Sequence, residues 1–161
     1  MKRTLSAFAI AAATVVYAGQ AEAVDRVEIG LLDCTVAGGT GFIFGSSKDL
    51  SCTFHPAEDG RPNETYSGSI DKFGIDIGKT GQTIIKWGVL APTEDDYAPG
   101  ALAGTYGGVS GEATVGVGVG ANALIGGSSE TIVLQPVSVQ AQEGLNVAVG
   151  IAKLNLNAAA D

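Results

Sequence analysis

The stretch QTIIKWGVLAP, residues 82–92, decides how the rest of the chain is interpreted. Its apolar residues Ile85, Trp87 and Val89 recur at every second position, and Lys86 and Gly88 take the positions between them. Successive side chains of a β-strand point to opposite faces, so this period of two is typical of a strand with one buried face. The stretch therefore predicts a strand whose apolar face packs against a core.

Two further segments alternate in the same way, and each carries one of the two cysteines of the chain. In LLDCTV (31–36) and LSCTF (50–54), the residues on the apolar face are Leu32, Cys34 and Val36, and Leu50, Cys52 and Phe54. In an exported protein an even pair of cysteines is most simply a disulfide. Two free buried thiols, or half of a metal site, are the alternatives. A metal site would need more histidine, cysteine or paired carboxylates nearby than the chain shows.

The remaining patterns also indicate strands and turns. In ETIVLQPVSVQ (130–140) the alternation changes phase at Pro136, which predicts an edge or a bulge there. In TYSGSIDKFGIDIG (65–78) it shifts around Gly68 and Gly74, as it would at bulges or bends. Turn signals occur at 55–63, 78–81, 91–100 and 126–129, and residues 24–161 show no helical stripe over three turns. We therefore predict an all-β fold, a small barrel-like or sandwich domain of antiparallel strands, some of them glycine-rich.

The N-terminal segment MKRTLSAFAIAAATVVYAGQAEA, residues 1–23, has the pattern of a secretory signal peptide. Lys2 and Arg3 precede an apolar run over residues 5–17, and an Ala-x-Ala cleavage pattern closes the segment at residues 21–23. The run is short for a membrane span, although an uncleaved anchor is the alternative. We expect residues 24–161 to form a single all-β domain in the periplasm or outside the cell.

The charge of the exported chain limits the classes of molecule that it can bind. Removing Lys2, Arg3 and Glu22 from the 9 basic and 17 acidic residues leaves 7 and 16, a net charge of −9. Nucleic acid and bare anionic lipid headgroups repel such an acidic chain. We therefore expect no nucleic-acid partner.

Two glycine motifs resemble nucleotide-binding loops, but the spacing of their glycines differs from that of the known motifs. GIDIGKT (74–80) has three residues between its first glycine and the GK pair where a phosphate-binding loop has four, and a strand pattern follows it. GVGVG (116–120) would need a glycine where Ala123 stands to match the dinucleotide fingerprint. We expect neither nucleotide nor cofactor.

The candidate catalytic and ion-binding residues are equally few. The single histidine, His55, lies opposite the apolar face of its strand and precedes Pro56, so we expect a solvent-facing turn residue. No G-x-S-x-G motif occurs, and no catalytic residue is predicted. Residues 94–96, Glu-Asp-Asp, could join a calcium site, but a solvated acidic loop is the simpler interpretation. Asn63-Glu64-Thr65 matches the N-glycosylation sequon, which matters only if the host organism glycosylates its proteins.

The stretch GEATVGVGVGANALIGG (111–127) places valines on one face of a predicted strand and Gly116, Gly118 and Gly120 on the other. A run of glycine weakens a strand, so it usually marks close approach by another segment or by a ligand. We expect close internal packing at this face, with a ligand-binding face as the alternative. An outer-membrane barrel would need strands of about ten residues with aromatic girdles, and the chain has few aromatic residues.

Several strings together resemble a known family: GFIFGSSKDLSCTF (41–54), YSGSIDKFGIDIG (66–78), WGVLAPT (87–93) and APGALAGTYGGVSGEATVGVGVGANALIGGS (98–128). They are similar to the bacterial domain of unknown function 992 family, and the likeness covers residues 30–156. This resemblance implies a small exported protein, mostly of alphaproteobacteria, with no assigned activity. Residues 107–155 are more loosely similar to SYLF-type lipid-binding barrels, a likeness that matches no functional residue here.

These observations predict a non-enzymatic binding module of the cell envelope, for lipid or another apolar ligand. The alternative is a structural or protein-interaction component of the envelope without a small ligand. An apolar cavity of ligand size would favour the first hypothesis, and a tightly filled core would favour the second.

Overall fold

The computed structural model describes residues 25–37, 47–72, 83–93, 97–108, 122–140 and 151–159. These residues form eight strands and no helix, so none of their segments is a helix that could cross a membrane. The strands are β1 (Val27–Val36), β2 (Ser47–Pro56), β3 (Glu64–Lys72), β4 (Thr83–Ala91), β5 (Gly104–Gly108), β6 (Leu124–Gly126), β7 (Ile132–Gln140) and β8 (Ile151–Ala158).

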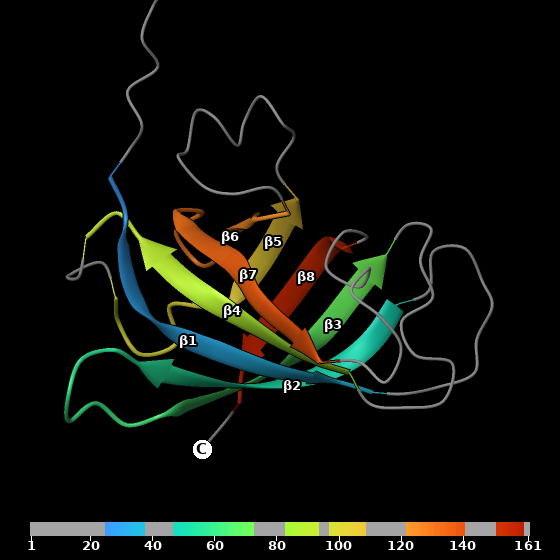
Figure 1. Cartoon of the computed structure of the whole chain (residues 1–161), viewed down its shortest axis with the longest axis horizontal. Helices are drawn as coiled ribbons and strands as arrows, with labels where there is room; N and C mark the ends of the chain where they lie inside the picture. Colours follow the sequence, from blue (N-terminus) through green and yellow to red (C-terminus); the bar gives the residue numbers. More distant parts are fainter. Residues whose placement is uncertain are drawn as a thin grey trace, which may run out of the picture.

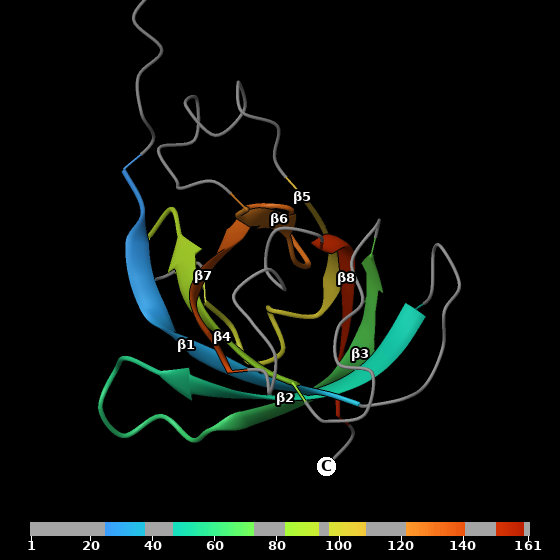
Figure 2. The ribbon, with the colours of Figure 1, turned by 45° about the vertical axis from the view of Figure 1, so that its right-hand side comes forward.

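The eight strands close into one barrel in the order β1-β2-β3-β8-β5-β6-β7-β4, and β4 pairs back with β1. Every neighbouring pair is antiparallel. Figure 1 shows the strands crossing the molecule, and the turned view of Figure 2 shows the closed ring that they form. The all-β prediction is confirmed, and of its two architectures the barrel is the one that forms.

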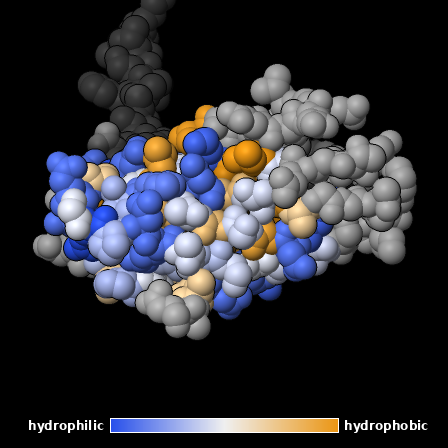
Figure 3. All heavy atoms as spheres, turned by 90° about the horizontal axis from the view of Figure 1, so that it is seen from below, coloured by the Kyte–Doolittle hydropathy of each residue, from blue (hydrophilic) through white to orange (hydrophobic). Residues whose placement is uncertain are grey.

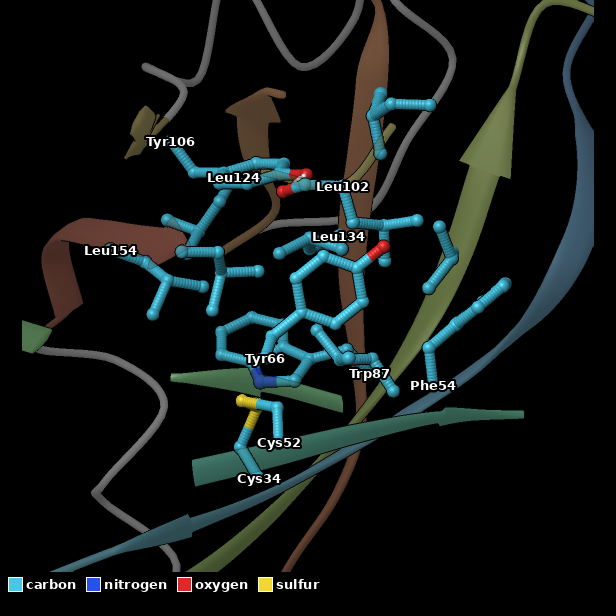
Figure 4. Packing of buried hydrophobic residues seen from close by; sticks show 14 of the residues in the cluster. Cys34, Cys52, Phe54, Tyr66, Trp87, Leu102, Tyr106, Leu124, Leu134 and Leu154 are labelled. Carbon is cyan, nitrogen blue, oxygen red and sulfur yellow. Dashed lines mark hydrogen bonds between the residues drawn. A yellow bond between two sulfur atoms is a disulfide. The ribbon is translucent and has the colours of Figure 1, made fainter. Parts of the chain in front are cut away.

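The predicted apolar faces point into this barrel. Ile85, Trp87 and Val89 of β4 are at most 1% exposed. In the register Cys34 lies opposite both Ile85 and Cys52, so the inward residues of β4, β1 and β2 stand side by side. The inward side chains of the described strands pack into one cluster of buried residues (Figure 4). The alternation read from the sequence is therefore the inside–outside pattern of the barrel wall.

A disulfide joins Cys34 to Cys52, with 4.0 Å between their Cα atoms. The two residues lie directly opposite each other on β1 and β2, and both are buried. Figure 4 shows the sulfur atoms beneath the rings of Trp87 and Tyr66. The bridge therefore fastens two adjacent strands from inside the core.

The bulge predicted at Pro136 is present. The register of β4 with β7 shifts at this point: Trp87 pairs with Pro136 and Lys86 pairs with Ser138, so Val137 is the extra residue. Proline cannot donate a ladder hydrogen bond, and a bulge accommodates it within a strand that is paired on both sides. The strand β7 is accordingly not an edge strand, since it pairs with β4 and with β6.

The prediction of a bulge or bend at Gly68 is wrong. β3 keeps its register with β2 and with β8 through Gly68, and the shift toward β8 comes at Asp71. A Cβ atom at Gly68 would lie 1.9 Å from the carbonyl oxygen of Asn155, so this glycine lets the backbone of β8 approach closely. Gly126 has the same role, because a Cβ there would lie 2.0 Å from the carbonyl oxygen of Thr105. Gly74 lies outside the described residues.

Residues 97–103, here called the strap, cross the end of the barrel at which β4 ends and β5 begins (Figure 1). Tyr97 and Leu102 of the strap belong to the core cluster. The hydroxyl of Tyr106 donates a hydrogen bond of 2.8 Å to the carbonyl of Leu102, and the amide of Ala101 donates one of 2.9 Å to Ala98. The strap therefore closes this end of the barrel with apolar side chains.

The outside of the barrel differs from one side to the other. On β2, β3 and β8 the outward positions carry small polar residues in matching rows, such as Ser51, Ser67 and Asn157. On β1, β4 and β7 exposed apolar residues occur, among them Leu31, Ile84 and Val137, the last 56% exposed. Figure 3, which shows the molecule from below, has a mostly hydrophilic face interrupted by hydrophobic spots.

Candidate functional site

A cleft of about 660 Å³ opens beside the strap. Four pieces of chain form it: the β2–β3 turn, the start of β3, the strap and the end of β8. The residues that line it include Arg61, Pro62 and Asn63 of the turn, Tyr97 and Pro99 of the strap, and Ala158 of β8. This volume lies within the range of about 300–1,000 Å³ that small-molecule sites commonly have. It is therefore large enough for a ligand, and it lies at the barrel end and not in the packed interior.

The carboxylate of Glu64, the first residue of β3, is the polar centre of the cleft. It accepts hydrogen bonds from the hydroxyls of Tyr66 and Tyr97, and one of 3.1 Å from the backbone N–H of Gly100. Tyr66 belongs to the same strand, whereas Tyr97 and Gly100 belong to the strap. The carboxylate therefore fastens the strap to β3.

These contacts decide the charge state of the cluster. Burial acts to raise the pKa of the Glu64 carboxyl, but the bonds from Tyr66, Tyr97 and Gly100 and the positive Arg61 outweigh it and hold that pKa below its usual value. The pKa values of Tyr66 and Tyr97 are raised, first by burial and then by the neighbouring carboxylate. Glu64 is therefore ionised with its oxygens engaged, which makes it a poor general base and a good structural acceptor.

Arg61 lies beside this cluster, over the ring of Tyr97. Its guanidinium carbon is 4.7 Å from the ring centroid, and its Nη1 donates a hydrogen bond of 3.3 Å to the carbonyl of Tyr97. Its Nε lies 2.5 Å from Oε2 of Glu58. Arg61 and Tyr97 also line a second hollow of about 190 Å³, which Glu28 and Pro56 border. The stacked pair therefore faces both hollows.

His55 does not belong to the cleft. It is exposed as expected, but it lies within β2 and not in a turn. Its Nε2 is 3.8 Å from Oδ2 of Asp33, and Nζ of Lys86 reaches the same oxygen at 2.9 Å. These three side chains lie on neighbouring strands, on the outside of the barrel.

Other residues singled out in the sequence lie outside the described residues: Gly116, Gly118 and Gly120, the GIDIGKT motif and residues 94–96. Within the described part of the chain, no three histidine, cysteine, aspartate or glutamate side chains gather into a group that could hold a metal ion.

The cleft itself was not predicted from the sequence. Glu64 appeared there only inside a sequon, and Tyr97 only inside a turn. One available signal was the position of Tyr97, a large aromatic residue between acidic residues and Pro99-Gly100 in a segment otherwise suited to solvent. Its partner on β3 could not be found in the same way, because 33 residues separate the two.

A family model described as protein of unknown function (DUF992) matches residues 12–157. This chain belongs to the DUF992 family. The match spans all eight strands apart from the last residue of β8, so the barrel and its end cleft are features of a DUF992 protein. No curated protein and no solved structure matches the chain. The likeness of residues 107–155 to SYLF-type barrels stays a prediction.

Proposed function

We propose that this DUF992 protein is a non-enzymatic binding module of the bacterial envelope, and that it holds a partly apolar ligand in the cleft beside the strap. The observation that carries the proposal is the cleft itself, about 660 Å³ in volume, with Pro62, Tyr97, Pro99 and Ala158 in its walls. Sites for small molecules combine apolar walls with a few placed polar groups, and here the polar groups of the lining are Arg61, Asn63, Glu64 and Thr65.

The packing of the barrel supports a site at its end. The inward side chains of the described strands, with Trp87 among the largest, form one buried cluster. A ligand inside such a cluster would have to displace core side chains, whereas a ligand in the cleft would contact residues that already border solvent. The cleft is therefore the better position for an apolar ligand.

The state of Glu64 supports a binding role over an enzymatic one. Its oxygens take hydrogen bonds from two tyrosines and one peptide group, and its pKa is lowered. A general base needs a pKa near the working pH, and the pKa of Glu64 lies on the acidic side of its usual value. The buried disulfide supports an oxidising location, the periplasm or the exterior, because such bonds persist there.

Native mass spectrometry of the mature protein recovered from its own envelope tests this proposal. We expect a bound small molecule on the wild-type protein. Ala158→Trp, which fills the space between β8 and Gly100, should remove it. Asn157→Trp is the matched control, because Asn157 is exposed on the neighbouring position of the strand. An adduct that survives Ala158→Trp, or no adduct at all, would contradict the proposal.

A role in protein interaction is the second candidate. The exposed apolar residues Leu31, Ile84 and Val137 on β1, β4 and β7 favour it, because soluble proteins often use such surface for contact. Crosslinking in the envelope of the wild-type protein and of Val137→Asp would test it. A partner that is lost in the variant supports this role, and an unchanged set of products opposes it.

A further inference from the structure

We propose that Arg61 binds an acidic group of the ligand, so that the ligand is an acidic amphiphile with an apolar body and one carboxylate or phosphate. This inference rests on the proposed function, because it specifies what the cleft beside the strap holds. Arg61 is the one cationic side chain among the described residues that line the cleft.

The guanidinium of Arg61 is held in a fixed orientation. It stacks at 4.7 Å over the Tyr97 ring, and its Nη1 donates to the carbonyl of the same residue. A side-chain hydrogen bond between Arg61 and Tyr97 also acts on the pKa of Tyr97, so the two side chains are held together at more than one point. A planar guanidinium offers parallel N–H groups that match the two oxygens of a carboxylate or the oxygens of a phosphate. An oriented arginine at the border of a cleft is suited to that contact.

The existing partner of Arg61 leaves room for a ligand anion. Glu58 contacts Nε from three residues away in the same turn, and its side chain is 68% exposed. Exposed ion pairs of this kind contribute little to stability, so a ligand anion can replace or join the contact at low cost. Glu64 attracts Arg61 through space, but its hydrogen bonds go to Tyr66, Tyr97 and Gly100, and it forms no direct ion pair with Arg61 among the described residues.

One part of the cleft wall suits the apolar body of such a ligand. Pro62 and Pro99 border it from the turn and the strap, and Ala158 borders it from β8. The side chains of these residues have no polar atoms, so hydrocarbon placed against them displaces water without leaving a donor or acceptor unpaired. Arg61 offers a contact for an acidic group, and the apolar walls beside it offer contacts for hydrocarbon. A ligand that makes both contacts is an amphiphile.

The net charge of the chain is −8, and this charge decides by which interaction Arg61 can select an acidic ligand. An acidic protein does not attract anions from a distance. The selection must therefore come from direct contact within the cleft. We accordingly expect the preference for an acidic group to appear in the affinity and to change little with salt, since contacts shorter than the Debye length are screened least.

Titration calorimetry of the mature protein with four probes of one chain length tests the inference: decanoate, decyl phosphate, decanol and decylammonium, each below its micelle concentration. We expect the acidic probes to bind at least about tenfold more tightly than decanol, as one oriented charged contact would give. Whichever of decanoate and decyl phosphate binds more tightly identifies the source of the acidic group. Equal binding of all four, or a preference for decylammonium, would overturn the inference and leave the proposed function standing. Binding of none would overturn both.

Variants of Arg61 complete the test. Arg61→Gln should abolish the preference for the acidic probes over decanol, and Arg61→Lys should keep part of that preference through its charge. Lys153→Gln removes one positive charge from an exposed position of β8 that does not line the cleft, and it should change nothing. Thermal unfolding of each variant checks that the barrel is intact. An acidic preference that persists in folded Arg61→Gln would show that Arg61 does not make the contact.

Discussion

Replacing Glu64 by glutamine changes the link between the strap and β3 while it keeps the shape of the side chain. The carboxylate accepts three hydrogen bonds, from Tyr66, Tyr97 and the N–H of Gly100. The amide of glutamine has one oxygen to accept with, and its NH₂ group faces a hydroxyl that now donates to the carboxylate. Hydrogen bonds to a charged group contribute about 1.5–3 kcal/mol each, against about 1 kcal/mol for neutral ones. We therefore expect Glu64→Gln to lower the free energy of unfolding by about 2–4 kcal/mol, a large part of the stability of a small domain.

The pH dependence of this effect has a definite sign. The pKa of Glu64 is lower in the folded protein than its usual value, because the hydrogen bonds and Arg61 outweigh the effect of burial. The ionised carboxylate therefore stabilises the fold fully above the unfolded pKa of about 4.3, and this stabilisation is lost as the pH falls through the folded pKa. The difference in stability between wild type and Glu64→Gln should be largest near neutral pH and should shrink below about pH 4.

Urea unfolding followed by the fluorescence of Trp87, which is the single tryptophan, measures both effects. Glu58→Gln is the control, because the Glu58 side chain is 68% exposed and forms an ion pair with Arg61. We expect the control to change stability by no more than about 0.5 kcal/mol. A cost of Glu64→Gln as small as that of the control, or a cost that does not change with pH, would refute the reasoning.

Three further predictions concern the frame of the barrel and its ligands. Reduction of the disulfide should lower the free energy of unfolding by about 3 kcal/mol, as the chain-entropy model gives for a loop of this size, and denaturant titration with and without reductant measures it. Gly68→Ala should cost more than about 1–3 kcal/mol, because its Cβ would meet the Asn155 carbonyl oxygen at 1.9 Å, whereas Gly107→Ala, with nothing within 4 Å, should be near neutral in the same unfolding assay. Mg-ATP should give no heat beyond dilution in calorimetry, because the motif at 74–80 has the wrong spacing for a phosphate-binding loop, and a saturable signal would contradict that interpretation.

The inward faces of the barrel could be predicted from the sequence because each is a local property. The alternation around Cys34, Cys52 and Trp87 specifies which side chains are buried, and the structure buries all three. The bulge at Pro136 was also readable, because proline lacks the N–H that a paired strand requires. The pairing of β3 with β8 could not be read in this way, since it joins segments far apart in the chain.

The sequence predicts close approach of another segment at Gly116, Gly118 and Gly120, which lie outside the described residues. Two other glycines, at described positions, have such a close neighbour. Close approach of a second backbone explains Gly68 and Gly126, where the nearest atom to an added Cβ is a carbonyl oxygen of a neighbouring strand. At Gly68 the change in alternation is interpreted from the sequence as a bulge or bend. A glycine interrupts the alternation in the same way whether the strand bends there or packs tightly against a neighbour, so the sequence pattern does not distinguish the two. The expected face of Gly116, Gly118 and Gly120 stays a prediction.

The cleft beside the strap forms only in the tertiary structure. Arg61 lies in the β2–β3 turn and Glu64 begins β3, whereas Tyr97 comes from a segment that resembles any solvated loop. Only the closure of the barrel by the strap brings the tyrosine hydroxyl to the carboxylate and the ring beneath the guanidinium. Polar residues near turns are common in every chain, so their composition alone could not distinguish this cluster from an ordinary surface.

The most direct test of a binding site at the barrel end is a nuclear magnetic resonance titration of the ¹⁵N-labelled mature protein with decanoate. The account predicts that the amide signals that move most belong to Arg61, to residues 63–66, to Gly100 of the strap, and to Ala158 and Ala159. The indole N–H of Trp87, which lies in the core, should stay in place. Shifts centred on Trp87 and its core neighbours, with the cleft residues unmoved, would place the ligand inside the barrel and contradict the account.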